Sequence, residues 1–205
     1  SDAAWKLNWD NVRTGIEWFC GSRWVGVAKA LPGPKWLEVD VMDFDKSHFQ
    51  LDGVRVFAAP DFAYQGPDGA AVIVDWKTGK AREGYDDQVL GYALYLNARY
   101  QLPLEGMTAH LVYVNDGVET EVRIDPAAVE AFKAKFKGSV AGMRALLLDP
   151  QSNVPLPEPH FPRTEDLTAC ARCAFRRPCG READLAAAKL AATERPDEPS
   201  TEPTT

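Results

Sequence analysis

The stretch that decides the fold of this chain is PDFAYQGPDGAAVIVDWKTG, residues 60–79. Its apolar run AVIV, residues 71–74, lies between two turn-forming segments, GPDG at 66–69 and TG at 78–79. A short apolar run bounded by turn residues predicts a buried strand. We therefore expect a hairpin whose second strand crosses the core and ends in charged residues.

The charged end of this predicted strand brings a carboxylate next to an ammonium group. Asp75 and Lys77 are two residues apart, so both point to one face of the strand, while Trp76 points to the other. Asp61, at the start of the hairpin, can approach from the adjacent strand. Two carboxylates beside a lysine form an oxygen-rich pocket suited to a hard divalent cation, with the lysine next to its water. In isolation, an Asp-x-Lys sequence is more typical of a surface ion pair.

Length and composition predict one ordinary domain. The chain has 205 residues, of which 45% are hydrophobic, enough for a sizeable core. We assign residues 1–182 to this domain and residues 183–205 to a helical extension with a disordered tail rich in Pro, Glu and Thr. The net charge of −7 argues against a protein that coats nucleic acid but does not exclude a nuclease.

The sequence also predicts a cellular compartment. No stretch approaches the roughly 18 continuous apolar residues of a membrane span. The first residues lack the basic and then apolar pattern of a secretion signal. We therefore expect a cytoplasmic protein that has no membrane partner.

Upstream of the hairpin the sequence predicts helices and then strands. Apolar residues recur near a 3.6-residue period over 9–31 and stop at Pro32-Gly33-Pro34, which indicates one or two amphipathic helices. Cys20 lies on or near the apolar side, where a single cysteine is most often a small core residue. Alternating apolar residues over 36–57, Val41 among them, predict a strand meander that runs into the hairpin.

Downstream of the hairpin, helical periodicity over 84–100 predicts a helix of about four turns. Gln88 and Tyr92 are four residues apart on it and share one face; such a tyrosine is often simple packing. Beyond this helix we expect two strands joined by a tight turn, a long helix with Asp125 as its N-cap, a proline-rich connection and an alanine-rich helix. These elements cover residues 110–114 and 119–124, 125–148, 149–163, and 182–194.

Cysteines form a second motif near the carboxyl end. Cys170, Cys173 and Cys179 lie within ten residues of one another, and disulfides are rare in a reducing compartment. With Cys20 they make four thiolates, a full ligand set for zinc or for a 4Fe–4S cluster. The spacing alone leaves both metals open. A bridge from Cys20 to the other three would close a loop of about 150 residues and so constrain the unfolded chain.

These motifs, in this order, resemble the PD-(D/E)xK nuclease superfamily and its RecB-like branch. The resemblance rests on Pro60-Asp61, then a hairpin, then Asp75-Trp76-Lys77-Thr78-Gly79, then Gln88-x-x-x-Tyr92. It implies an α/β fold with a central mixed β-sheet flanked by helices, the restriction-endonuclease-like core. It also implies a Mg²⁺- or Mn²⁺-dependent deoxyribonuclease.

The resemblance assigns a role to each matched residue. Asp61, Asp75 and the backbone carbonyl of Trp76 would be the metal ligands, and Lys77 would orient or activate the attacking water. Gln88 and Tyr92 would contact DNA. The implied activity is that of an exonuclease on single-stranded or unwound DNA, with a helicase or another DNA-processing protein as a separate partner.

The cysteine spacing resembles the iron–sulfur branch of the RecB-like nucleases, which includes AddB-type helicase-nucleases and CRISPR-adaptation nucleases. By this resemblance Cys20, Cys170, Cys173 and Cys179 would hold a structural 4Fe–4S cluster that joins the two ends of the chain. Zinc is the alternative.

One part of the RecB-like pattern is missing. These enzymes commonly add a histidine from a helix before the first Asp, and no histidine precedes His48 here. His48 is best interpreted as a structural or surface residue, which leaves Glu17 as the other candidate ligand. Two rival interpretations follow: a catalytically inactive DNA-binding or scaffold protein with the same fold, and a zinc-stapled protein of unrelated function.

Overall fold

The computed structural model describes residues 2–39, 43, 45–80 and 85–193. The chain forms two compact units, residues 1–142 and 143–205, and each is described by itself. The division into a nuclease domain over 1–182 and an extension over 183–205 stays a prediction. The predicted disordered tail lies outside the described residues from 194 onward.

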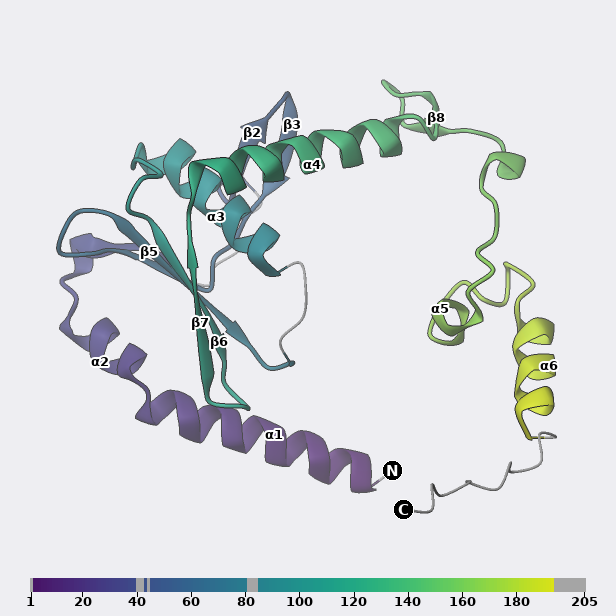
Figure 1. Ribbon diagram of the computed structural model, residues 1–205, viewed down its shortest axis with the longest axis horizontal. Helices are drawn as coiled ribbons and strands as arrows, with labels where there is room; N and C mark the ends of the chain where they lie inside the picture. The colour runs from purple at the N-terminus through teal and green to yellow at the C-terminus, as the bar shows by residue number, and fades with distance from the viewer. Residues whose placement is uncertain (1, 40–42, 44, 81–84, 194–205) are drawn as a thin grey trace, which may run out of the picture. The chain divides into compact units, whose positions relative to one another are not determined.

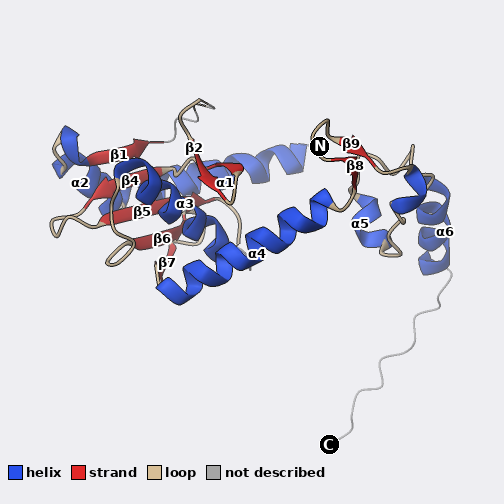
Figure 2. Cartoon of the chain, turned by 90° about the horizontal axis from the view of Figure 1, so that it is seen from above, coloured by secondary structure: helices blue, strands red, loops and turns tan. Residues whose placement is uncertain are grey.

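A five-stranded mixed sheet forms the centre of the first unit, and Figure 2 shows its strands side by side. Only the β5–β6 pair is parallel, among the described strand pairs of this sheet. Parallel neighbours need a crossover connection, and α3 (Tyr85–Tyr100) lies between these two strands in the chain. The α/β prediction with a mixed central sheet is confirmed. In spatial order the strands are β1 (Trp36–Val39), β4 (Phe62–Gln65), β5 (Ala71–Lys77), β6 (Thr108–Tyr113) and β7 (Val118–Arg123).

The hairpin expected from residues 60–77 is formed by β4 and β5. Phe62 pairs with Val74 and Gln65 with Ala71, and the Gly66 N–H donates to the Ala70 carbonyl across the turn at 2.8 Å. When this antiparallel pairing is continued by one residue, Asp61 lies across from Asp75. The register of the hairpin therefore places Asp61 at the carboxyl end of β5, the strand that carries Asp75.

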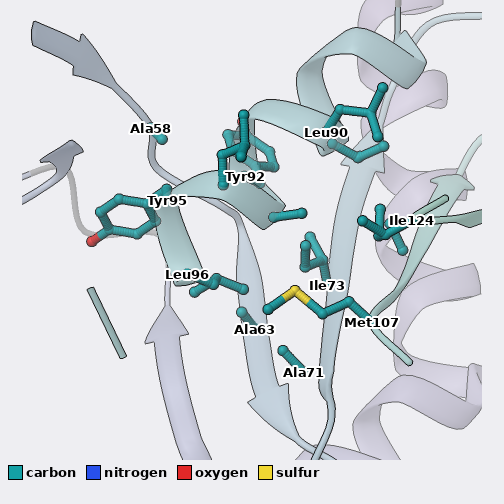
Figure 3. Close-up of a cluster of buried hydrophobic side chains, with 14 of the residues drawn as sticks. Ala58, Ala63, Ala71, Ile73, Leu90, Tyr92, Tyr95, Leu96, Met107 and Ile124 are labelled. Atoms are coloured by element: carbon teal, nitrogen blue, oxygen red, sulfur yellow. The ribbon is translucent and has the colours of Figure 1, made fainter. Parts of the chain in front are cut away.

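One face of the sheet packs against α3 and α4 (Pro126–Arg144), and Figure 1 shows both helices on the same side. The sheet contributes small and branched side chains, such as Ala63 and Ile73, both fully buried. Helix α3 contributes larger ones, including Tyr95 and Leu96, as Figure 3 shows. We call this the α3 face.

The opposite face packs against α1 (Asp2–Gly21) and α2 (Arg23–Ala30). Its centre is the indole of Trp24, which is 1% exposed and packs with Phe62, Val74 and Val112. Side chains alternate in direction along β5. Val74 and Trp76 therefore point to this face of the sheet, whereas Ile73 and Asp75 point to the α3 face. We call this the α2 face.

Helix α1 confirms the predicted element but corrects the predicted core. Gly15 lies so close to the turn between β6 and β7 that an added Cβ would be 2.9 Å from the Asn115 side chain. The apolar residues that set the helical period are nevertheless partly exposed: Trp9, Val12, Ile16 and Phe19 are 36–57% exposed. Cys20 is exposed as well, so its interpretation as a small core residue is wrong.

The meander predicted over 36–57 is only partly correct. β2 (His48–Leu51) and β3 (Val54–Phe57) form strands, but they pair with each other in a separate two-stranded sheet. Phe49 from β2 is buried against the same core as α3. The predicted strand position of Val41 lies outside the described residues. A short 3₁₀ turn, η1 (Gly33–Lys35), precedes β1.

The hairpin of β6 and β7 forms at the predicted turn. Gly117 has φ +65°, and a Cβ there would also lie 2.9 Å from Trp18 Nε1, so the turn requires glycine for two reasons. Asp125 then caps α4, because its carboxylate accepts from the Ala127 N–H at 2.9 Å.

Helix α4 ends at Arg144 rather than near Leu148, because residues 147–149 form a strand instead. That strand, β8 (Leu147–Asp149), pairs with β9 (Val154–Pro155) in the second unit. The other regular elements described in the second unit are helical and include the predicted alanine-rich helix. Its elements are η2 (Glu158–His160), α5 (Leu167–Ala171) and α6 (Glu182–Thr193).

Candidate active site

The first predicted carboxylate, Asp61, is fixed by the neighbouring strand. Pro60 before it is fully buried, and proline restricts the backbone that enters β4. The Trp76 N–H donates to Asp61 Oδ2 at 2.7 Å. This bond ties the side chain to the carboxyl end of β5, next to Asp75 in the sequence.

The second carboxylate, Asp75, is buried on the α3 face with an exposure of 1%. Lys77 Nζ lies 2.5 Å from Asp75 Oδ2, which confirms that the two side chains share one face. Burial raises the pKa of the Asp75 carboxyl, and the Lys77 ammonium opposes that rise. Burial disfavours the charged form of Asp75, and a bound cation would stabilise that charged form.

Helix α3 contributes two side chains that extend the hydrogen bonding from the charged pair of Asp75 and Lys77. Lys77 Nζ donates to Gln88 Oε1 at 2.6 Å, and Gln88 Nε2 donates to the Tyr92 hydroxyl at 2.6 Å. The side chains of Asp75, Lys77, Gln88 and Tyr92 therefore form one continuous polar chain. The sequence indicated that Gln88 and Tyr92 share a helix face, but it gave no sign that Gln88 holds Lys77.

A hollow of about 370 Å³ opens beside this polar chain. Gln88 and Tyr92 line it on one side, and residues 56–59, at the end of β3 and just after it, line it on the other. Asp87, also at its edge, is paired with Lys135 of α4. Gln88 and Tyr92 are therefore reached from a hollow between α3 and the chain that leads into Asp61.

The residues present fit a divalent cation that completes its shell with water and phosphate. Mg²⁺ is typically bound by one or two carboxylates together with substrate oxygens, and Asp61 and Asp75 would supply two. Across the described ranges no cluster of three or more His, Cys, Asp or Glu side chains is placed to hold a metal. His48 lies in β2, where the centroid of its ring is 6.1 Å from the centroid of the Phe57 ring. Glu17 is exposed on α1.

The cysteines divide between the two units. Cys20 lies in the last turn of α1 in the first, whereas Cys170, Cys173 and Cys179 belong to the second. There the Phe175 N–H donates to Cys173 Sγ at 3.3 Å, and backbone donors to sulfur stabilise thiolate ligands. The Arg163 guanidinium donates to the Cys179 carbonyl at 2.9 Å. The cluster joining the ends of the chain stays a prediction.

A mixed sheet with helices on both faces, and a carboxylate–lysine site at the end of its central strand, is consistent with a restriction-endonuclease-like core. A protein-family model described as the PD-(D/E)XK nuclease superfamily matches residues 13–180. The chain therefore belongs to the PD-(D/E)XK nuclease superfamily. No curated protein matches the chain. Within its described part, no helix has the length and apolar character needed to cross a bilayer.

Proposed function

We propose that this chain is a Mg²⁺- or Mn²⁺-dependent deoxyribonuclease of the RecB-like type, an exonuclease on single-stranded or unwound DNA. The observation that carries the proposal is the polar chain of Asp75, Lys77, Gln88 and Tyr92, with the Asp61 carboxylate fixed beside it. Family membership supports nuclease chemistry. A DNA end and a separate helicase or other DNA-processing protein are the proposed partners, and a cytoplasmic location is part of the proposal.

The chemistry is hydrolysis of a phosphodiester bond. The oxygen of water attacks phosphorus, a P–O bond to one sugar breaks, and the leaving oxygen gains a proton. Asp61, Asp75 and the Trp76 carbonyl would hold a divalent cation, which would supply Lewis-acid charge at the phosphate. Lys77 orients the attacking water and offsets the negative charge that develops, because its ammonium is held between the Asp75 and Gln88 oxygens.

The test is cleavage of end-labelled single-stranded and duplex DNA by the full chain, with Mg²⁺, Mn²⁺ or EDTA. We expect metal-dependent degradation that Asp75→Asn abolishes, because the amide keeps the shape of the carboxylate but not its charge. Product lengths separate stepwise removal from an end from internal cuts. The matched control is Asp10→Asn, which changes an Asp on α1 that pairs with Arg13.

A second candidate function is a non-catalytic DNA-binding scaffold. It is favoured by the small number of carboxylates at the site, where the described residues offer Asp61 and Asp75 but no third. The same assay decides between the two. A wild-type chain that binds DNA yet leaves it intact with every metal supports the scaffold and contradicts the nuclease.

We also propose that Cys20, Cys170, Cys173 and Cys179 hold a structural 4Fe–4S cluster. The cysteine spacing supports it, as does the N–H donor to Cys173 Sγ. Anaerobically purified protein should be brown and contain iron and sulfide, and Cys173→Ala should lose both. Colourless protein with about one zinc per chain would replace the cluster with the zinc alternative.

A further inference from the structure

A second hollow, of about 420 Å³, lies on the other side of Asp61, over the α2 face. Its volume falls in the roughly 300–1,000 Å³ range of small-ligand pockets. Aromatic rings dominate its lining: Phe19, Trp24, Trp36, Phe62 and Trp76 surround it, with Ala28, Val39 and Asp61. We call it the aromatic pocket.

The rings in the aromatic pocket are arranged for stacking. Phe62 and Trp76 are nearly parallel, at an interplanar angle of 15° and with ring centroids 6.1 Å apart. Two further rings stand edge-on to this pair, Phe19 against Trp76 at 5.4 Å and Trp36 against Phe62 at 5.3 Å. Trp36 and Phe19 are 38% and 36% exposed, so their rings are available to a flat ligand.

The charge of the aromatic pocket argues against phosphate as its occupant. Among the described residues that line it there is no Lys or Arg, and the carboxylate of Asp61 is the one charged group they contribute. Phosphate groups bind where basic side chains or exposed N–H groups gather. An uncharged, flat, aromatic group fits these walls instead.

Asp61 connects the aromatic pocket to the candidate active site. It lines the hollow, while its Oδ2 accepts the Trp76 N–H at the end of β5. A ligand with a phosphate at Asp61 and Asp75 would therefore have its neighbouring groups at the mouth of the aromatic pocket. In a nucleic acid strand, the group linked to each phosphate through the sugar is a nucleobase.

We propose that the aromatic pocket binds one unpaired nucleobase of the DNA strand whose phosphate lies at Asp61 and Asp75. The proposal rests on the proposed nuclease function for the phosphate position. It identifies Trp36 and Phe19 as the residues that contact the base. A base paired within a duplex cannot enter such a pocket without leaving its stack, so the pocket selects single-stranded or frayed ends.

The test separates base contacts from phosphate contacts. The affinity of the full chain for a fluorescein-labelled thymidine oligonucleotide is compared, by fluorescence anisotropy, with its affinity for an abasic strand of equal length. Ca²⁺ replaces Mg²⁺ in both measurements. We expect the base-containing strand to bind about tenfold more tightly, the size of effect that aromatic stacking produces.

The variants locate that effect. Trp36→Ala should weaken binding of the thymidine strand about tenfold and leave the abasic strand unchanged, and Trp36→Phe should restore most of the loss. Phe19→Ala should act in the same direction. Trp5→Ala is the matched control, because Trp5 is 65% exposed on α1 and lies outside the aromatic pocket.

Two results would overturn the proposal: equal affinity of the wild-type chain for both strands, or a Trp36→Ala loss that is the same for both. A parallel cleavage assay in Mg²⁺ separates failure of the aromatic pocket from failure of the nuclease. Cleavage without base-dependent binding refutes the aromatic pocket alone. Base-dependent binding that Trp36→Ala removes, without any cleavage, supports the pocket and refutes the nuclease.

Discussion

Two carboxylates on the first unit, Glu38 and Asp75, have opposite surroundings. Glu38 Oε1 accepts from the hydroxyls of Tyr95 and Tyr100, each at 2.7 Å, and also lies 3.1 Å from Arg99 Nε. Asp75 has one ionic partner among the described residues, the ammonium of Lys77. The first carboxylate is surrounded by donors that fix β1 to α3. The second, within the described part of the chain, meets one cation, which also donates to Gln88.

The difference shows which carboxylate is structural. Oε1 of Glu38 is already occupied by protein donors, and the pKa values of both tyrosines are raised by burial and by that carboxylate. A cation arriving at Glu38 would have to displace those donors, whereas at Asp75 it would offset the cost of burial. We therefore expect Glu38 to control stability and the Asp75 centre to control catalysis.

The largest expected effect is that of Lys77→Met on cleavage. The methionine keeps an unbranched apolar stem but removes the ammonium that faces the reacting groups, so the cleavage rate should fall about 100-fold or more. It is measured with a labelled single strand at saturating Mg²⁺. Lys6→Met, at an exposed position on α1, should cleave like the parent. A Lys77→Met chain that cut DNA at the parental rate would remove Lys77 from the proposed mechanism.

The next largest effect is expected at the structural carboxylate, Glu38. Glu38→Ala should lower the free energy of unfolding by about 2–3 kcal/mol, because buried donors lose a charged acceptor. Urea denaturation followed by far-UV circular dichroism measures it. Cleavage per folded molecule should be unchanged. A large loss of cleavage by a folded Glu38→Ala chain would contradict the division between structural and catalytic carboxylates.

Gln88→Ala should have a smaller effect and reports how Gln88 acts. Losing the hydrogen bond from Lys77, together with the one to Tyr92, should reduce kcat about tenfold and leave KM nearly unchanged. This makes Gln88 a positioning residue for the Lys77 ammonium. If KM instead rises while kcat holds, Gln88 contacts DNA directly, as the family resemblance implies. Gln50→Ala, at an exposed glutamine of β2, is the matched control.

The sequence was sufficient for the parts of the site that depend on local periodicity. The two-residue alternation of a strand predicted that Asp75 and Lys77 share one face. The four-residue spacing of Gln88 and Tyr92 predicted that they share one side of a helix. Turn residues located the hairpin that carries Asp61. Each of these predictions uses neighbours within about one element, where backbone geometry alone sets the direction of side chains.

What the sequence could not show depends on contacts between distant elements. The Lys77–Gln88 hydrogen bond requires the packed position of α3 over β5. The role of Glu38 requires β1 beside the same helix, and nothing near Glu38 indicates two tyrosine donors about 60 residues away. Periodicity also failed on α1, because it identifies an apolar stripe but not whether another element covers it.

The smallest expected effect lies on the α2 face, at His110 of β6. This imidazole is 8% exposed and its Nδ1 lies 2.9 Å from Glu119 Oε1, with Arg23 and Glu121 also acting on it. Burial lowers the pKa of His110 despite the attraction of Glu119. Below a pH of about 6.5 the unfolded chain therefore binds a proton that the folded chain resists, and stability falls as the pH falls.

His110→Gln should flatten this part of the profile of unfolding free energy against pH, measured by urea denaturation. His160→Gln, at an exposed position in the second unit, should leave the slope unchanged. An equally steep acid slope in His110→Gln would show that another group sets it.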